Sequence, residues 1–211
     1  MSKLNLTLAC ALSLTAAAAF AQTNGNARVE GVGARSATAG LVKAGRYKVD
    51  PGHTQVIWSV DHMGFSRLYG MVGDMSGTLD LNPARLTLSK LAIDIPISGL
   101  TVTSTGFAGH LKTAELFDAS KFPTARFVSR SVAVRGQRAT IAGNLTLRGI
   151  TKPVVLEAQF YGAGPNPMSK AQTVGFSAKG RLKRSDFGLG YAVPAVSDDV
   201  DLEITAAFER I

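Results

Sequence analysis

The chain has 211 residues and a formal net charge of +8, which fits one basic domain of ordinary size. Its single cysteine, Cys10, lies in the N-terminal apolar run, so the rest of the chain has no thiol for a disulfide, a nucleophile or a thiolate metal ligand. No long Lys/Arg run or nucleic-acid motif occurs, and we expect no nucleic-acid partner.

Residues 1–21 form the first predicted element, a secretory signal peptide. Lys3 precedes the apolar run, and Ala19-Phe20-Ala21 form a small-x-small cleavage site before Gln22. The run is short for a transmembrane anchor, and no later apolar run is long enough to span a membrane. We therefore expect cleavage after Ala21 and a soluble periplasmic protein.

Residues 22–45 are rich in Gly, Ala, Ser and Thr and show little apolar periodicity. This composition is typical of a flexible leader. The folded domain is then predicted to occupy residues 46–211.

The rest of the chain shows the period-two alternation of strands with one buried face. Val200, Leu202, Ile204, Ala206 and Phe208 share one face of the last such segment. The same pattern, or a compatible one, predicts strands over 54–63, 70–81, 88–97, 124–134, 139–149, 153–160 and 173–184. Turn signals separate these segments, and helices between successive strands are missing, which excludes Rossmann and TIM folds.

Eight or nine long strands joined by short links predict an all-β fold, an extended antiparallel barrel or a sandwich. A barrel of about eight strands can enclose one small or elongated ligand. Several inward positions hold small residues, including Ala158, Ala178 and Gly180, and such a tube is hard to fill with side chains. Large residues from opposite strands could still fill it, so the pattern leaves both an open and a closed interior.

Residues 104–120 interrupt the strand pattern with helix-compatible spacing. Phe107, Leu111 and Ala114 recur at i, i+4 and i+7, and Ser104 or Thr105 can cap the start. We expect a short helix here, followed by aromatic residues, lying across the mouth or the flank of the barrel.

The chain has three histidines, His53, His62 and His110, and three His can make a zinc site. Their spacing matches no metal motif, and a structural or ligand-contacting histidine is the favoured interpretation. No G-x-S-x-G elbow and no phosphate loop occurs. The sequence thus predicts no catalytic residue, no metal and no cofactor.

Basic residues cluster in a stretch from Ala119 to Leu156 that contains no Asp or Glu, and again at Lys179, Arg181, Lys183 and Arg184. We interpret most of them as the solvated outer face of strands. A subset at a barrel mouth could attract a phosphate or a membrane surface.

Five segments, in order, resemble the YceI family of exported, lipocalin-like barrels that bind polyisoprenoid lipids. They are "YKVDPGHTQVIWSVDHMGFSRLYG", "HLKTAELFDASKFPTARFVS", "GNLTLRGITKPVVLEAQF", "LKRSDFGLG" and "DDVDLEITAAFE". The resemblance covers the chain from about Tyr47 to Phe208. Two positions depart from the family pattern: Thr54 stands where Ser is common and keeps the hydroxyl, and Met71 stands where Phe is usual.

The resemblance implies a non-enzymatic binding or carrier protein for a long-chain isoprenoid lipid, such as a quinone or a polyprenyl phosphate, with fatty acids or amides as alternative ligands. Transient contact with a membrane surface is a further expectation. The proposed lining residues are Trp58, Val60, Phe107, Leu111, Phe117, Phe176 and Phe208, and the proposed head-group residues are His110 and Arg126. The alternatives are a metal- or His-dependent enzyme on the same barrel and a closed structural or interaction barrel.

Overall fold

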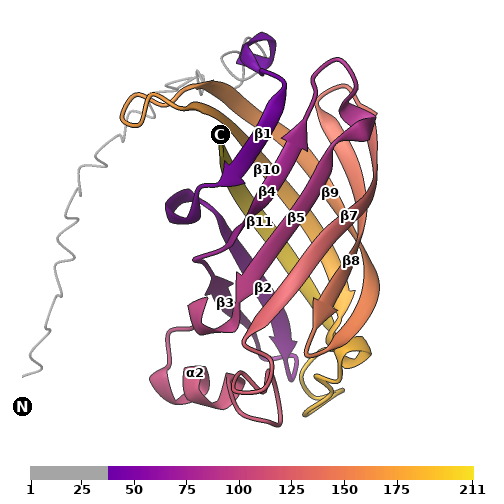
Figure 1. The fold of residues 1–211 in the computed structure, drawn as a ribbon. Coiled ribbons are helices and arrows are strands. Elements are labelled where there is room, and N and C mark those ends of the chain that lie inside the picture. Colours follow the sequence, from indigo (N-terminus) through magenta and orange to yellow (C-terminus); the bar gives the residue numbers. More distant parts are fainter. Residues whose placement is uncertain (1–37) are drawn as a thin grey trace, which may run out of the picture. The chain divides into compact units, whose positions relative to one another are not determined.

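A computed structural model describes residues 38–211 as a single barrel unit with one α-helix (Figure 1), and the predicted signal peptide lies outside the described residues. The strands are β1 (Gly45–Val49), β2 (Gln55–His62), β3 (Ser66–Val72), β4 (Ser76–Leu81), β5 (Lys90–Pro96), β6 (Leu100–Thr101), β7 (Thr124–Arg135), β8 (Arg138–Leu147), β9 (Ile150–Pro165), β10 (Gln172–Lys183) and β11 (Asp199–Arg210). The helices are α2 (Thr105–Leu111) and the short 3-10 turns η1 (Ala39–Leu41), η2 (Pro51–His53), η3 (Leu86–Leu88), η4 (Ile97–Gly99) and η5 (Arg184–Phe187). Within residues 38–211, no helix has the length and hydropathy needed to cross a bilayer.

The sheet is closed by antiparallel pairing. Eight strands form a ring in the order β1-β4-β5-β7-β8-β9-β10-β11, because β11 returns to pair with β1. β2 and β3 continue from β11 beside β1, and the short β6 pairs with β3. This arrangement confirms the predicted lipocalin-like antiparallel barrel of about eight strands with a short helical insert.

One edge of β11 has two partners in succession. Residues 201–205 pair with β2, and residues 208–210 pair with β1. Between them, the buried Thr54 hydroxyl accepts from the Ala207 N–H at 3.0 Å and donates to the Ala207 carbonyl at 3.2 Å. The Asp50 N–H also donates to the Ala207 carbonyl at 2.9 Å, so a side-chain hydroxyl completes the pairing that η2 interrupts, and Thr54 can supply it as Ser would.

The alternating apolar and polar residues of the sequence form the inward and outward faces of the barrel wall. On β10, Val174 is fully buried and faces Phe208 of β11, and Phe176 faces Ala206 in the same register. The charged residues further along β10 point outward, and Lys179 lies within 3.5 Å of Glu203 on the outer face. The predicted inward face of β11, from Val200 to Phe208, is confirmed.

Two predicted elements are divided or shortened in the structure, and β9, at Ile150–Pro165, is longer than the expected strand 153–160. The expected strand 70–81 is divided between β3 and β4, and Asp74 between them has a φ of 55°. The helix ends at Leu111, because the Phe117 N–H bonds to the Leu111 carbonyl and Asp118 adopts a φ of 48°. Ser104 caps α2 as predicted, since its Oγ accepts from the Phe107 N–H at 3.3 Å.

The last residues of the predicted leader make defined contacts with the barrel. Thr38 Oγ1 accepts from the Ala163 N–H at 3.3 Å, and the Leu41 carbonyl accepts from Gln172 Nε2 at 2.9 Å. β1 begins at Gly45. The segment from 38 to 45 therefore packs against β9 and β10, where the sequence analysis placed a flexible leader.

Gly70 offers the sharpest test of the packing of β2 on β3. It is the register partner of Trp58, and a Cβ at Gly70 would lie 2.1 Å from Trp58 Cζ2. We expect Gly70→Ala to lower the free energy of unfolding by about 1–3 kcal/mol through overpacking. Gly73→Ala is the matched control, since a Cβ there meets nothing within 4 Å, and urea unfolding of both variants measures the difference. Equal stability of the two variants would contradict the packing of Trp58 on Gly70.

Candidate ligand-binding site

The barrel interior contains two apolar clusters. The α2-end cluster consists of Leu100, Leu111, Leu116, Phe127, Leu145, Val154, Leu156, Phe187 and Leu189. The β1-end cluster consists of Tyr47, Val49, Met75, Leu79, Leu81, Ile93, Val174 and Phe208. Leu91 packs against both clusters. The interior is therefore apolar from one end to the other.

The predicted lining residues divide between these clusters. Leu111 belongs to the α2-end cluster, and three aromatic residues pack against it: Trp58, Phe107 and Phe117. Phe208 belongs to the β1-end cluster, where Phe176 meets it edge to face with ring centroids 6.2 Å apart. Val60 is buried on β2 and is a member of neither cluster.

Many inward side chains retain accessible surface although they belong to a closed barrel. These half-buried residues are Val56, Trp58, Ile141, Phe176, Ala178, Leu182, Leu202, Ile204 and Ala206. An inward side chain can stay accessible only if it faces unfilled space or a gap between strands. Ala178 on β10 also pairs with Ala158 on β9, so two small side chains lie side by side in this part of the barrel wall.

The α2 end of the barrel is held by Arg148, which lies in the turn between β8 and β9. Its guanidinium donates to the Gly188 carbonyl at 2.5 Å and to the Ala114 carbonyl at 2.6 Å. The rings of His110 and Tyr191 meet edge to face, with centroids 5.2 Å apart. These contacts join the segment after α2 to the loop after η5, so both cover the same end of the barrel.

Arg184 fixes the loop between η5 and β11. It is buried, and its guanidinium donates to four backbone carbonyls, those of Leu189, Tyr191, Val196 and Ser197. Burial lowers the pKa of Arg184 from its usual value. The sequence analysis grouped Arg184 with solvated outer-face cations, and this interpretation is wrong because the side chain turns inward to organise the loop.

Next to this loop, Ser185 holds the carboxylate of Asp198. The Ser185 N–H and hydroxyl donate to it at 2.8 and 2.7 Å. Desolvation raises the pKa of Asp198, but these hydrogen bonds and the charges of Lys183 and Arg184 outweigh it and lower the pKa below its usual value. The carboxylate therefore stays ionised and helps to fix the start of β11.

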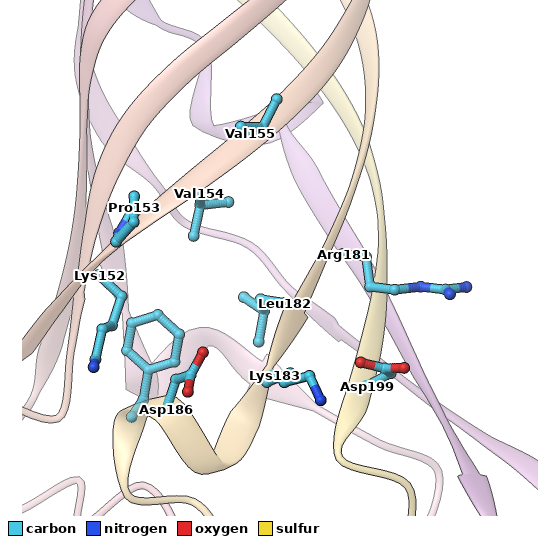
Figure 2. A pocket seen from close by; sticks show the side chains of 10 residues that line it. Lys152, Pro153, Val154, Val155, Arg181, Leu182, Lys183, Asp186 and Asp199 are labelled. Carbon is cyan, nitrogen blue, oxygen red and sulfur yellow. The ribbon is translucent and has the colours of Figure 1, made fainter.

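A pocket of about 330 Å³ opens between β9 and β10 beside η5. Figure 2 shows Val154 on β9 and Leu182 on β10 facing this opening, with Lys152 and Lys183 at its edge. Its volume lies at the lower end of the range of roughly 300–1,000 Å³ that is common for ligand pockets. Val154 is a member of the α2-end cluster and Leu182 packs against it, so the floor of the pocket is part of the apolar interior.

The three histidines occupy separate places. His53 Nδ1 lies 2.7 Å from Asp50 Oδ2 in the exposed turn η2, and His62 ends β2 in a bridge to Val196. His110 lies on α2, with its Nδ1 3.9 Å from Glu115 Oε2. Within residues 38–211, no group of three His, Cys, Asp or Glu side chains is placed to hold a metal ion.

Of the two predicted head-group residues, His110 lies at the α2 end beside Tyr191, and Arg126 lies on the outer face of β7. The flanking Ala125 and Phe127 are buried inward, and Arg126 points outward to Asp94 at 2.5 Å. The structure therefore does not bring the two together. Sequence reasoning also missed Arg148, Arg184 and Pro153, of which the proline inside a strand was the one visible signal.

The closed antiparallel barrel and its apolar interior define the chain as a lipocalin-like β-barrel protein. Residues 47–208 match the family model described as the YceI-like domain. The chain is 35% identical over 170 residues to Protein YceI of Salmonella arizonae, covering 80% of this chain and 88% of that protein. The chain therefore belongs to the YceI family.

Solved structures share the fold. The crystal structure of Burkholderia cenocepacia BcnA matches with a TM-score of 0.68 at 21% identity, over 75% of this chain and 98% of BcnA. A domain from Saccharophagus degradans, described as a polyisoprenoid binding domain implicated in plant cell wall breakdown, matches with a TM-score of 0.59 at 12% identity. That match covers 80% of this chain and 100% of the domain.

Replacement of Arg184 tests its structural role. In Arg184→Leu, four backbone carbonyls lose their donors and a buried charge is removed, and we expect the free energy of unfolding to fall by about 3 kcal/mol or more. Arg126→Leu is the control, because its exposed pair with Asp94 contributes about 0–1 kcal/mol. Urea denaturation followed by Trp58 fluorescence measures both, and equal losses would contradict the role assigned to Arg184.

Proposed function

We propose that this chain is a non-enzymatic binding or carrier protein that holds a long-chain isoprenoid lipid, a quinone or a polyprenyl phosphate, inside the barrel. The observation that carries the proposal is the set of apolar, inward and half-buried side chains, most of which pack against one of the two clusters. Membership of the YceI family and the shared fold of a domain described as polyisoprenoid binding support it. From the signal peptide predicted by the sequence, we infer a periplasmic location for this function.

The energetics favour a hydrocarbon ligand. Each buried CH₂ group contributes roughly 0.8 kcal/mol, from which the cost of immobilising the ligand must be subtracted. A chain of several isoprene units can therefore bind tightly without any polar contact. The same apolar interior would accept a fatty acid or an amide, and extraction of the purified protein followed by mass spectrometry separates these ligands from isoprenoids.

The arrangement of the histidines supports binding over catalysis. His53 is engaged by Asp50 in an exposed turn, and His110 faces Tyr191 at the other end of β2 from that turn. General acid–base catalysis needs such groups within hydrogen-bond reach of one reacting atom. We assign His110 to the lipid head group or to the fastening of α2, and Arg126 to the outer surface.

Trp58 provides an intrinsic reporter, because it is the only tryptophan in the chain and packs against the α2-end cluster. We expect a benzoquinone with a short isoprenoid tail to quench its fluorescence saturably. Phe117→Ala should weaken binding by about tenfold, the change that a loss of about 1.4 kcal/mol of apolar contact produces. Val128→Ala on the outer face of β7 is the matched control. A protein whose fluorescence is unaffected, and which carries no extracted lipid, would contradict the proposal.

We propose further that the α2 end of the barrel contacts a bilayer during ligand exchange. The β2–β3 turn exposes Phe65 by 87% and Met63 by 50%, and the adjoining loop exposes Tyr191 by 52%. The Met63 N–H bonds to the Ala195 carbonyl, so turn and loop form one surface. Exposed aromatic and aliphatic side chains of this kind insert into the interface of a bilayer.

Phe65→Ser tests this contact. Loss of one inserted Phe should reduce binding to vesicles of phosphatidylethanolamine and phosphatidylglycerol by about tenfold, since burial of Phe contributes about 1.5–3 kcal/mol. Met168→Ser is the control, because Met168 is 91% exposed in the β9–β10 turn at the opposite end of β10 from η5. Co-sedimentation measures both variants, and an equal loss in the two would count against a docking surface at the α2 end.

A further inference from the structure

The pairing of β9 with β10 stops before the two strands end. Their register runs from Gln172↔Pro165 to Gly180↔Leu156 and no further. Beyond it, β9 still pairs with β8 down to Ile150, and β10 still pairs with β11 down to Lys183. Residues 150–155 of β9 therefore lack a strand partner on the β10 side, and the closed barrel has an open seam there.

Pro153 explains from the sequence why β9 and β10 do not pair along this seam. Arg148 and Gly149 have φ values of 53° and 74° and form a two-residue hairpin turn, so Leu147 and Ile150 are a hydrogen-bonded pair. Hydrogen-bonded and non-bonded pairs alternate along an antiparallel ladder. Asn144↔Pro153 is then a non-bonded pair, and the nitrogen of Pro153 points toward β10. Proline has no N–H to donate, so the seam cannot close at this residue.

The pocket of about 330 Å³ occupies this seam, and its floor is apolar. Val154 and Phe187 line it and are both buried members of the α2-end cluster. Leu182 packs against the same cluster. A hydrocarbon chain that enters between β9 and β10 would therefore meet the interior side chains directly.

The rim of the pocket is charged. Lys152, Lys183, Asp186 and Asp199 line it, as does Arg181, whose guanidinium lies 2.6 Å from Asp201. Among the described residues, no ion pair engages Lys152 or Lys183. An apolar floor beneath a rim of both charges is suited to an amphiphile, whose chain is buried while its polar head stays at the surface.

We propose that the seam between β9 and β10, held open by Pro153, is the lateral mouth through which the hydrocarbon chain of an amphiphilic ligand enters and leaves the barrel. The inference rests on the proposed binding function and adds the route of the ligand. The polar head remains at the rim between Lys152 on β9 and Lys183 on β10, and α2 and the loop after η5 keep the end of the barrel closed.

A single-cysteine label tests the route. In a Cys10→Ser background, Val155→Cys places one thiol at the mouth, where Val155 is 49% exposed and lines the pocket. Val128→Cys, 40% exposed on β7, is the matched control. Each is modified with a bulky polyethylene-glycol maleimide, and mass spectrometry verifies the modification. Stopped-flow quenching of Trp58 then gives the association and dissociation rates of the short-tailed isoprenoid quinone.

The label at residue 155 should slow both rates by roughly tenfold or more relative to its unlabelled form, while the label at residue 128 leaves them unchanged. Pro153→Val, which restores a donor to the seam, should slow exchange in the same direction without a label. If both labelled variants show normal quenching amplitude and equal association and dissociation rates, the proposed lateral mouth would be wrong, and the binding function would stand. No quenching in the unlabelled protein would overturn the binding function, and the mouth with it.

Discussion

The barrel depends on β11, because this strand is hydrogen-bonded along both edges and converts a sheet into a ring. β10 follows one edge over its whole length, from Thr173 to Lys183, whereas the other edge is shared by β2 and β1. An antiparallel sheet with free edges exposes backbone donors and acceptors to pairing with other chains. The strand pairing of β11 is interrupted at η2, where the Asp50 N–H donates to the Ala207 carbonyl and the Thr54 hydroxyl bonds both the N–H and the carbonyl of Ala207.

Closure also decides how the interior is filled. The two ends are packed by large residues that converge from several strands, as Phe127 and Leu156 do near α2. Between the ends, β9 and β10 place Ala158 opposite Ala178. Two small residues in register on neighbouring strands leave this part of the wall thin. An interior with dense ends and a thinner middle suits an elongated apolar ligand better than a compact polar one.

Features of the structure that depend on local sequence were predicted, and features that depend on contacts between distant residues or on special backbone angles were not. Period two reflects a local choice between inside and outside, and it located most strands and the inward face of β11 correctly. The division of residues 70–81 into two strands and the end of α2 at Leu111 depend on backbone bonds and on positive φ at Asp74 and Asp118, which periodicity does not reveal.

Charged residues were the least predictable part of the candidate site. Arg184 and Arg181 are neighbours of the same kind in the sequence, yet one is buried against four carbonyls and the other is exposed beside Asp201. The difference arises from a loop that folds back around Arg184, and only the fold brings these carbonyls together. Arg126 illustrates the converse, since alternation alone places it opposite Ala125 and Phe127, and thus outside the barrel.

The basic side chains at the α2 end therefore fall into two groups with different environments. Arg148 and Arg184 direct their donors to backbone carbonyls, and this use fixes the turn after α2 and the loop after η5 as rigid covers. Lys152 and Lys183 lie on strands that separate from each other, where the backbone of β9 has lost its neighbour. A barrel that is clamped at its end and unpaired along one seam yields more easily at the seam than at the clamp, because opening the seam breaks no strand pairing. In the proposed route, access to the interior is set by the missing backbone donor of Pro153, and selection of the ligand by the apolar side chains behind it.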